Sequence, residues 1–365
     1  MNLEQTDEQT ALRHTVRRFL AEQASTATHV RPMLDEPTGT TEQSWRSLAE
    51  LGATGLLVPT EFDGAGMSMV EAGIVAEELG AALHPGPWLS CAVAAPRALY
   101  RFDVGGDAAA LLTGIADGSV IVTVANVSGP RPEAFRHGQD VVLRGAMAGV
   151  PDAAAAHVLL TLADDADGAG LFAVRTQEAG VEVTAEPGFD QTRKNFRVVL
   201  KDAPAQLLAA ASPDAIRALA DDVLCAYAAD ALGSAHAVMT EAIEYAKVRR
   251  QFGQPIGSFQ AVQHLCVDMY ETVELARSGV LHALWAADAG DSGERHLAAV
   301  RTKAFAARLA AVGETAIQVL GGVGYTWDHD AHLYLKRLLT WSAFLGGADE
   351  YLTEIGRALA QSLPR

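Results

Sequence analysis

The spacing of apolar residues changes twice along this chain, near residue 118 and near residue 206, and this order limits the possible folds more than any other feature. Before the first change and after the second, apolar residues recur at helical spacing. Between them lie short β-branched segments separated by Gly, Asp and Pro, which are typical of a small sandwich or barrel. We therefore predict an α+β multidomain protein. Its parts are an N-terminal α-helical domain (1–117), a middle β-sandwich or barrel domain (118–205) and a C-terminal four-helix bundle (206–365).

Local signals place individual helices within the helical parts. Thr6, followed three residues later by Gln9, predicts a capping box at the start of the first helix. Pro213 and Gly257 are plausible boundary residues in the C-terminal part. The bundle is predicted from four long amphipathic stretches, which cover roughly 213–247, 258–290, 294–320 and 346–362.

Composition and charge exclude several classes of protein. Hydrophobic residues make up 49% of the chain and charged residues 20%, as in an ordinary globular protein. No apolar run approaches the roughly 18–20 residues that cross a bilayer, and the N-terminus lacks a signal-peptide pattern, so we expect a cytoplasmic protein without a membrane segment. The formal net charge of −17 argues against nucleic acid and against acidic membrane surfaces as partners. Three separated cysteines, Cys91, Cys225 and Cys266, predict neither disulfides nor a zinc site.

Two motifs in the C-terminal part combine a fixed cation with glycine-rich turns. In "EYAKVRRQFGQPIGSFQAVQHLCVDMY" (244–270), Arg249 supplies a planar guanidinium that suits a diphosphate. The glycines on either side of Pro255 predict a turn that brings the backbone close to a ligand. In "QVLGGVGYTWDHDAHLYLKR" (318–337), Gln318 ends a helix, and the Gly-rich turn that follows permits close approach to a phosphate or an adenosine.

Each of these residues also has an ordinary structural interpretation. Arg249 and Arg250 could form a solvated helix end, and Phe252 could be a core residue. A single GGVG turn is a weak signal by itself. Binding is favoured only by the combination of both motifs at their separation along the chain.

The two motifs resemble the signatures of the acyl-CoA dehydrogenase family, and "LAELGATGLLVPTEFDGAGMSMVEAGIVAEELG" (48–80) resembles its N-terminal helices and the loop between them. The resemblance covers nearly the whole chain, with the three parts in the same order. It implies FAD as the cofactor. The motif residues of one subunit would bind, across the subunit interface, the ADP half of an FAD whose flavin ring lies in the neighbouring subunit. The cofactor-binding residues implied in this way are Arg249, Phe252, Ile256, Gln260, Gln318, Gly321 and Gly322.

The resemblance also implies a reaction, the oxidation of an acyl-CoA thioester to 2,3-enoyl-CoA. A carboxylate removes the α-proton while hydride passes from the β-carbon to the flavin, and general-base catalysis of this kind contributes roughly 10²–10⁴-fold. The usual base position of the family corresponds here to Leu345, which cannot accept a proton. Gly347 stands where the family has a threonine that contacts the flavin.

Some members of the family place the base at the start of the first bundle helix instead. That position corresponds to Val223, which is also apolar. Asp222 stands one residue earlier and is a weak candidate for the base, although an aspartate at a helix start is more often a cap or a dipole partner.

The middle domain also lacks residues that the family uses, in this case those that bind the flavin ring. The strand that binds the flavin ring in the family corresponds to "VTVANVSGPRPEAF" (122–135), which has no Thr-Glu pair, and no Trp follows in the later strands. The chain therefore resembles the non-catalytic partner of a heteromeric α2β2 acyl-CoA dehydrogenase. Such a chain implies a homologous catalytic subunit as its partner, an electron-transfer flavoprotein as the electron acceptor, and fatty acid or steroid catabolism as the setting.

Two other interpretations remain open. The chain could be a self-sufficient homo-oligomeric acyl-CoA dehydrogenase with Asp222 as the base, or a binding or regulatory homologue without flavin. His329 and His332 form an i, i+3 pair, but no further ligand lies at a familiar zinc spacing, so we predict no metal site. The sequence leaves the acyl group of the substrate undetermined.

Overall fold

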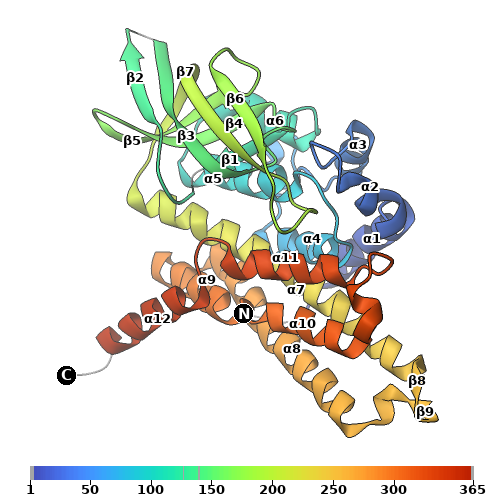
Figure 1. The fold of residues 1–365 in the computed structure, drawn as a ribbon. Coiled ribbons are helices and arrows are strands. Elements are labelled where there is room, and N and C mark those ends of the chain that lie inside the picture. Colours follow the sequence, from blue (N-terminus) through green and yellow to red (C-terminus); the bar gives the residue numbers. More distant parts are fainter. Residues whose placement is uncertain (1–3, 126, 139, 363–365) are drawn as a thin grey trace. The chain divides into compact units, whose positions relative to one another are not determined.

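The computed structural model describes residues 4–125, 127–138 and 140–362, and the chain divides into two compact units. The first unit combines the chain up to Val30 with Gly73–His84 and with the residues from Leu224 onward. The second unit combines Arg31–Ala72 with Pro85–Val223. Segments that are distant in the sequence thus share one core, while the order of helices, barrel and helices along the chain confirms the predicted fold class (Figure 1). The predicted domain boundaries at 117/118 and 205/206 stay a prediction.

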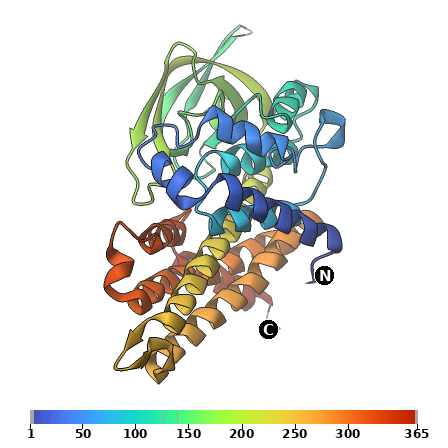
Figure 2. The same ribbon diagram turned by 90° about the vertical axis from the view of Figure 1, so that its right-hand side faces the viewer.

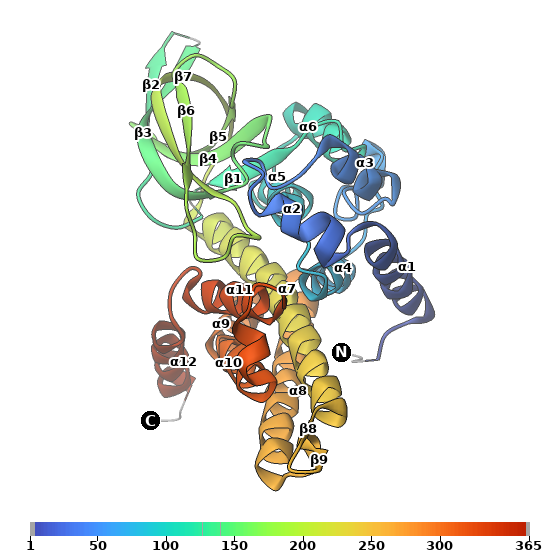
Figure 3. The same ribbon diagram turned by 45° about the vertical axis from the view of Figure 1, so that its right-hand side comes forward.

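The second unit contains a β-barrel (Figures 1 and 3). Its strands are β1 (Val122–Ala125), β2 (Glu133–His137), β3 (Asp140–Pro151), β4 (Val158–Asp165), β5 (Gly168–Arg175), β6 (Val181–Glu186) and β7 (Asn195–Ala210). β5 pairs with β7 on one side and with β4 on the other, so the path β4-β2-β3-β7-β5 returns to its start. Leu143, Leu159 and Phe172 are fully buried at the centre of this core.

The second unit also contains the shorter helices of the N-terminal part. They are α2 (Arg31–Met33), α3 (Glu42–Glu50), η2 (Thr60–Phe62), η3 (Leu89–Ala94), α5 (Ala95–Arg101), η4 (Gly106–Ala108) and α6 (Ala109–Ala116). Indole donors tie this region together, because Trp88 Nε1 donates to Ala53 O at 2.9 Å and Trp45 Nε1 donates to Gly118 O at 2.8 Å. A buried indole N–H needs such a partner.

The first unit is helical. Its elements are α1 (Asp7–Gln23), η1 (Thr26–Val30), α8 (Gln260–Ala289), α9 (Ser292–Ala306), α10 (Leu309–Leu320), η6 (Gly321–Tyr325), α11 (Ala331–Ala343) and α12 (Ala348–Ser362), with most of α4 (Met69–Ala81) and of α7 (Pro213–Val248). The capping box predicted for the first helix is present, since Thr6 and Gln9 bond reciprocally. The hairpin of β8 (Arg250–Gln251) and β9 (Gln254–Pro255) joins α7 to α8 (Figure 2).

Two glycines allow α4 and α7 to touch along their backbones. A Cβ atom on Gly80 would lie 1.9 Å from Asp230 O, and one on Gly233 would lie 1.8 Å from Glu77 O. Ser234 Oγ, on the same face of α7, donates to Gly80 O at 2.9 Å. Any larger residue at either glycine would force the helices apart.

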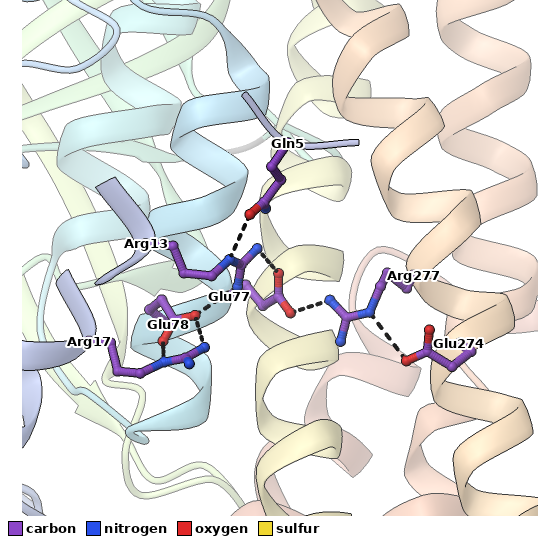
Figure 4. A network of polar contacts seen from close by, with 7 residues as sticks. All are labelled: Gln5, Arg13, Arg17, Glu77, Glu78, Glu274 and Arg277. Atoms are coloured by element: carbon purple, nitrogen blue, oxygen red, sulfur yellow. Dashed lines mark hydrogen bonds and ion pairs between the residues drawn. The ribbon is translucent and has the colours of Figure 1, made fainter. Parts of the chain in front are cut away.

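A network of ion pairs joins α1 and α8 to α4 within this unit (Figure 4). Arg13 pairs with Glu77 at 2.8 Å and with Glu78 at 2.7 Å, and Arg277 from α8 reaches Glu77 from the other side. Burial by itself raises the pKa of the Glu77 carboxyl, but the guanidinium groups of Arg13 and Arg277 outweigh it and hold the pKa below its ordinary value. Glu77 is therefore a charged hub between three helices.

The structure differs from the sequence prediction at two element boundaries. The stretch 294–320, predicted as one helix, is broken after Ala306, whose carbonyl accepts a hydrogen bond from Trp341 Nε1 at 3.0 Å. Helical structure was predicted from residue 206 onward. In the structure, strand β7 continues to Ala210, because Leu207 and Ala209 pair with β5. Tertiary pairing overrides the helix propensity of this alanine-rich segment. In the part of the chain that the structure describes, no helix is long and apolar enough to cross a membrane.

Candidate functional site

The first predicted motif forms the hairpin between α7 and α8. Phe252 and Gly253 occupy the two central turn positions with φ angles of 50° and 83°, and positive φ at both positions is what a type I′ turn requires. Ile256 N donates to Arg249 O at 2.7 Å and closes the base of the hairpin. Gln260 then begins α8. The structure thus brings Arg249, Phe252, Ile256 and Gln260 together on one projecting element.

The side chains of this hairpin are directed to solvent. Phe252 is 91% exposed, and its ring meets Phe259 edge to face with centroids 6.1 Å apart. Arg249 is exposed, and no carboxylate of the described residues lies within ion-pair distance of it. Val248, directly before it, is 72% exposed. The hairpin therefore presents apolar and cationic side chains to solvent.

The second motif forms a separate group at the end of α10. Gln318 is exposed in the last turn of this helix, and Gly321 ends it with a φ angle of 65°, a left-handed conformation that favours glycine. A Cβ atom on Gly321 or Gly322 would meet nothing within 4 Å, so the backbone here is open to a ligand. Both groups belong to the first unit, and α10 packs against α8.

The usual base position lies in the turn after α11. Leu345 is half-buried with a φ angle of 53°, which is uncommon for a bulky side chain. Tyr351 donates its hydroxyl to Leu345 O at 2.6 Å and fixes this turn. Phe344 stacks on Tyr227 with ring centroids 4.3 Å apart and 16° between the planes. The preceding residue is thus engaged in aromatic packing, and the Leu345 side chain offers no proton acceptor.

The alternative base position is also engaged in packing, within the second unit. Val223 is buried, and Asp222 is fully buried. Asp222 Oδ2 accepts from Arg97 Nε and from Arg101 Nε, both at 2.8 Å, while Oδ1 accepts from Arg101 Nη2 at 2.9 Å. A carboxylate held by two guanidinium groups has both oxygens occupied, so this geometry gives Asp222 a structural role. Sequence reasoning missed Arg97 and Arg101, which no motif marks.

The residues of this chain differ in how well they fit the two halves of FAD, the flavin ring and the ADP half. Every residue of β1 is buried, and the segment from 118 to 210 contains no Trp that could stack on a ring. The corresponding strand region includes Asn126, which lies outside the described residues. The residues present do not fit the ring. The exposed guanidinium, the exposed aromatic tip and the open Gly321–Gly322 backbone do fit a diphosphate and a nucleoside.

The two histidines considered for a metal have protein partners. His329 Nε2 lies 3.5 Å from Glu241 Oε1, and its Nδ1 accepts from Ala331 N at 3.1 Å at the start of α11. His332 contacts the edge of Trp327, with centroids 4.6 Å apart. Burial raises the pKa of the Glu241 carboxyl, although His329 partly offsets this. These contacts order the segment before α11.

Comparison with known proteins identifies the family. The models described as acyl-CoA dehydrogenase N-terminal domain and C-terminal domain match residues 6–109 and 225–360. IpdE2 of Mycobacterium tuberculosis is 32% identical over 332 residues, with 91% of each chain covered. The chain belongs to the acyl-CoA dehydrogenase family. This is a family of FAD-dependent oxidoreductases, as predicted from the two motifs.

The match covers different shares of the length of other similar proteins. FadE34 of Mycobacterium tuberculosis is 37% identical over 371 residues, which cover 98% of this chain but only 48% of that protein, so the chain spans about half of it. Among solved structures, the ChsE4–ChsE5 complex from Mycobacterium tuberculosis has a TM-score of 0.90 at 27% identity, with 100% of both chains covered. A variant of the Tcur3481–Tcur3483 steroid ACAD has a TM-score of 0.88 at 29% identity, covering 97% of this chain and 98% of that one.

Proposed function

We propose that this chain is the non-catalytic, cofactor-clamping subunit of a heteromeric α2β2 acyl-CoA dehydrogenase. One contrast carries the proposal: Arg249 and Phe252 on the hairpin are exposed, whereas the base positions hold the apolar residues Leu345, which is half-buried, and Val223, which is buried. A chain built in this way can contribute to the cofactor site of a neighbour. Neither of the family's usual base positions, Leu345 and Val223, offers a carboxylate.

The assembly would oxidise an acyl-CoA thioester to 2,3-enoyl-CoA. When bound, FAD supplies the acceptor for the hydride. The Arg249 guanidinium would hold the pyrophosphate through charge-assisted hydrogen bonds, and Phe252, Ile256 and Gln260 would line the same half of the cofactor. Gln318, Gly321 and Gly322 would approach the nucleoside through their open backbone. Because the net charge is −17, only a local cation of this kind can attract a dianion.

Two similar structures support a heteromeric arrangement. The ChsE4–ChsE5 complex and the Tcur3481–Tcur3483 steroid ACAD are each named for two proteins. We propose by analogy that the partner here is a homologous catalytic subunit and that the substrate is a fatty or steroid-derived acyl-CoA. An electron-transfer flavoprotein would be the acceptor and the cytoplasm the location. The domain boundaries 1–117, 118–205 and 206–365 belong to the same proposal.

The self-sufficient alternative requires Asp222 to act as the base. The buried pairing of Asp222 with Arg97 and Arg101 speaks against it, because a base must reach the proton that it removes. A homologue without any flavin would leave the exposed hairpin without a ligand. The contrast between the exposed hairpin and the apolar base positions therefore favours the clamping subunit over both alternatives.

Co-expression tests the proposal. The chain would be purified alone and together with an acyl-CoA dehydrogenase subunit encoded beside it, and the flavin absorbance and the turnover of CoA thioesters would be measured. We expect flavin and turnover only in the co-purified assembly. Flavin and turnover in the isolated chain would support the self-sufficient enzyme, and the absence of flavin in both preparations would support a binding homologue.

A further inference from the structure

Lys303 is a buried lysine at the end of α11 that the proposed function does not use. Its side chain, on α9, is fully buried. Nζ donates to Trp341 O at 2.5 Å and to Ser342 O at 3.3 Å, and it lies 4.0 Å from the centroid of the Trp341 ring. The two carbonyls belong to the last turn of α11, where helix carbonyls have no partner within the helix. Lys303 thus caps α11 from a neighbouring helix.

Trp341 completes the connection in the opposite direction. Its indole donates to Ala306 O, which is free to accept because the helix breaks between α9 and α10. Two reciprocal hydrogen bonds therefore fasten the end of α9 to the end of α11. The turn from Phe344 to Gly347 follows directly and includes the left-handed Leu345. Its position depends on where α11 ends.

No carboxylate of the described residues lies within ion-pair distance of Lys303 Nζ. Charged pairs around α9 include His282 of α8 with Glu294, and Glu354 of α12 with His296. On α11, Arg337 pairs with Asp230, and Glu350 of α12 lies beside the turn, with Oε2 2.8 Å from where a Cβ on Gly346 would be. His296 is seven residues before Lys303, about 10 Å along the helix. Burial without a counter-ion lowers the pKa of the Lys303 amine to about 7.

We propose that Lys303 anchors the Phe344–Gly347 turn through the end of α11, and that protonation of its amine loosens this anchor. The neutral amine donates to both carbonyls without burying a charge. The ammonium gains hydration if the turn opens, because water can then reach it. Opening is therefore coupled to uptake of one proton. The proposal concerns a conformational property of this chain and does not depend on the cofactor clamp.

The direction of the pH dependence follows from linkage. In the open state the amine has an ordinary pKa of about 10.4, and in the closed state its pKa is about 7. Between these values the open state binds a proton that the closed state lacks, so each unit of falling pH raises the open fraction up to tenfold. Below about pH 7 both states are protonated and the open fraction becomes constant.

Hydrogen exchange of the 341–351 segment tests the coupling. Phe344 N donates to Trp341 O and Gly346 N donates to Ala343 O, so these amides report opening of the turn. In the intact chain we expect protection factors, corrected for the intrinsic exchange rate, to rise up to tenfold per pH unit between pH 7 and pH 9. Lys303→Met should be protected without this slope, and strands β3–β7 should show no slope in either protein. Equal slopes in both proteins, or a flat profile in the wild type, would overturn the proposal.

A second measurement needs no variant at Lys303. The chain has five lysines, Lys194, Lys201, Lys247, Lys303 and Lys336, so their ¹³Cε resonances can be resolved in labelled protein. Burial also lowers the pKa of the Lys194 amine, and Lys194→Arg identifies its resonance. One of the four other resonances should titrate near pH 7. If all four titrate above pH 9, Lys303 does not release its proton near neutrality, and the proposed pH dependence of the turn is wrong.

Discussion

The hairpin and the base region use polar and aromatic groups in opposite ways. Two guanidinium groups bind the Asp222 carboxylate, and Phe344, which precedes Leu345, stacks on Tyr227. On the hairpin, Phe252 is 91% exposed and Arg249 is exposed without an acidic partner among the described residues. The Asp222 carboxylate is thus paired within the second unit and Phe344 is stacked within the first, whereas the hairpin side chains face solvent.

This difference distinguishes residues whose role is internal packing from residues whose role is binding another molecule. Buried polar groups that lack partners are costly, so a position that has lost its chemistry tends to be paired or replaced by apolar residues. Exposed aromatic and cationic side chains usually contribute little to the stability of the isolated chain. Their presence on the hairpin is best explained by a ligand or a partner, and each prediction below can break or sharpen this contrast.

The largest effect is expected for Asp222→Ala. The substitution removes the carboxylate that pairs with buried Arg97 and partly buried Arg101, and loss of one partner from a buried ion pair costs about 3–5 kcal/mol. Chemical denaturation of the variant and of Asp349→Asn, which alters an exposed carboxylate, would measure this. A stable Asp222→Ala protein that had lost turnover would instead make Asp222 a catalytic base.

An intermediate effect is expected for Glu77→Gln. Its partners are partly exposed, so we expect a loss of about 2–3 kcal/mol at pH 7, below the cost for a fully buried pair. Because the folded-state pKa of Glu77 is lowered, its contribution is present above about pH 4.5 and is lost as the pH falls through the folded value. The stability gap between wild type and variant should therefore narrow in acid.

The control for this prediction is Glu244→Gln. Glu244 pairs with Lys247 on the surface of α7, and both side chains are exposed. Its replacement should change the free energy of unfolding by less than about 0.5 kcal/mol. Equal losses in the two variants would mean that the network around Glu77 contributes no more than a surface pair.

The smallest effect is expected for Leu345→Glu. The substitution restores a carboxylate at the usual base position, but Gly347 and the barrel strands still do not fit a flavin ring. We therefore expect no flavin in the isolated variant and no turnover of CoA thioesters above the wild-type background. An active, flavin-loaded homo-oligomer would show that our account of the barrel is wrong.

The sequence predicted the architecture well because helical and strand periodicities are strong, local signals. It did not predict the break between α9 and α10, where Ala306 O accepts a hydrogen bond from Trp341, a residue far along the chain. The end of β7 was misplaced for a similar reason, since pairing with β5 overrides alanine propensity. Both errors arise where a distant segment decides local structure.

The candidate site was predicted unevenly. Motif residues such as Arg249 and Gln318 could be named because their spacing follows a known family. Arg97, Tyr227 and Lys303 could not, because no motif marks them and their roles exist only in three-dimensional contacts. The surroundings of Asp222 follow from the same kind of contact, so its suitability as a base could be judged only from the structure.

The central claim is tested most directly by Arg249→Ala in the co-purified assembly, with Arg250→Ala as the matched control. A charge-assisted hydrogen bond to the FAD pyrophosphate is worth about 1.5–3 kcal/mol, so losing one weakens FAD binding about tenfold or more. The ratio of flavin to protein absorbance after dialysis should fall for Arg249→Ala and stay near the wild-type value for Arg250→Ala, while both assemblies remain intact. An unchanged ratio for Arg249→Ala, or equal losses in both variants, would contradict the account of this chain as the clamp for a neighbour's cofactor.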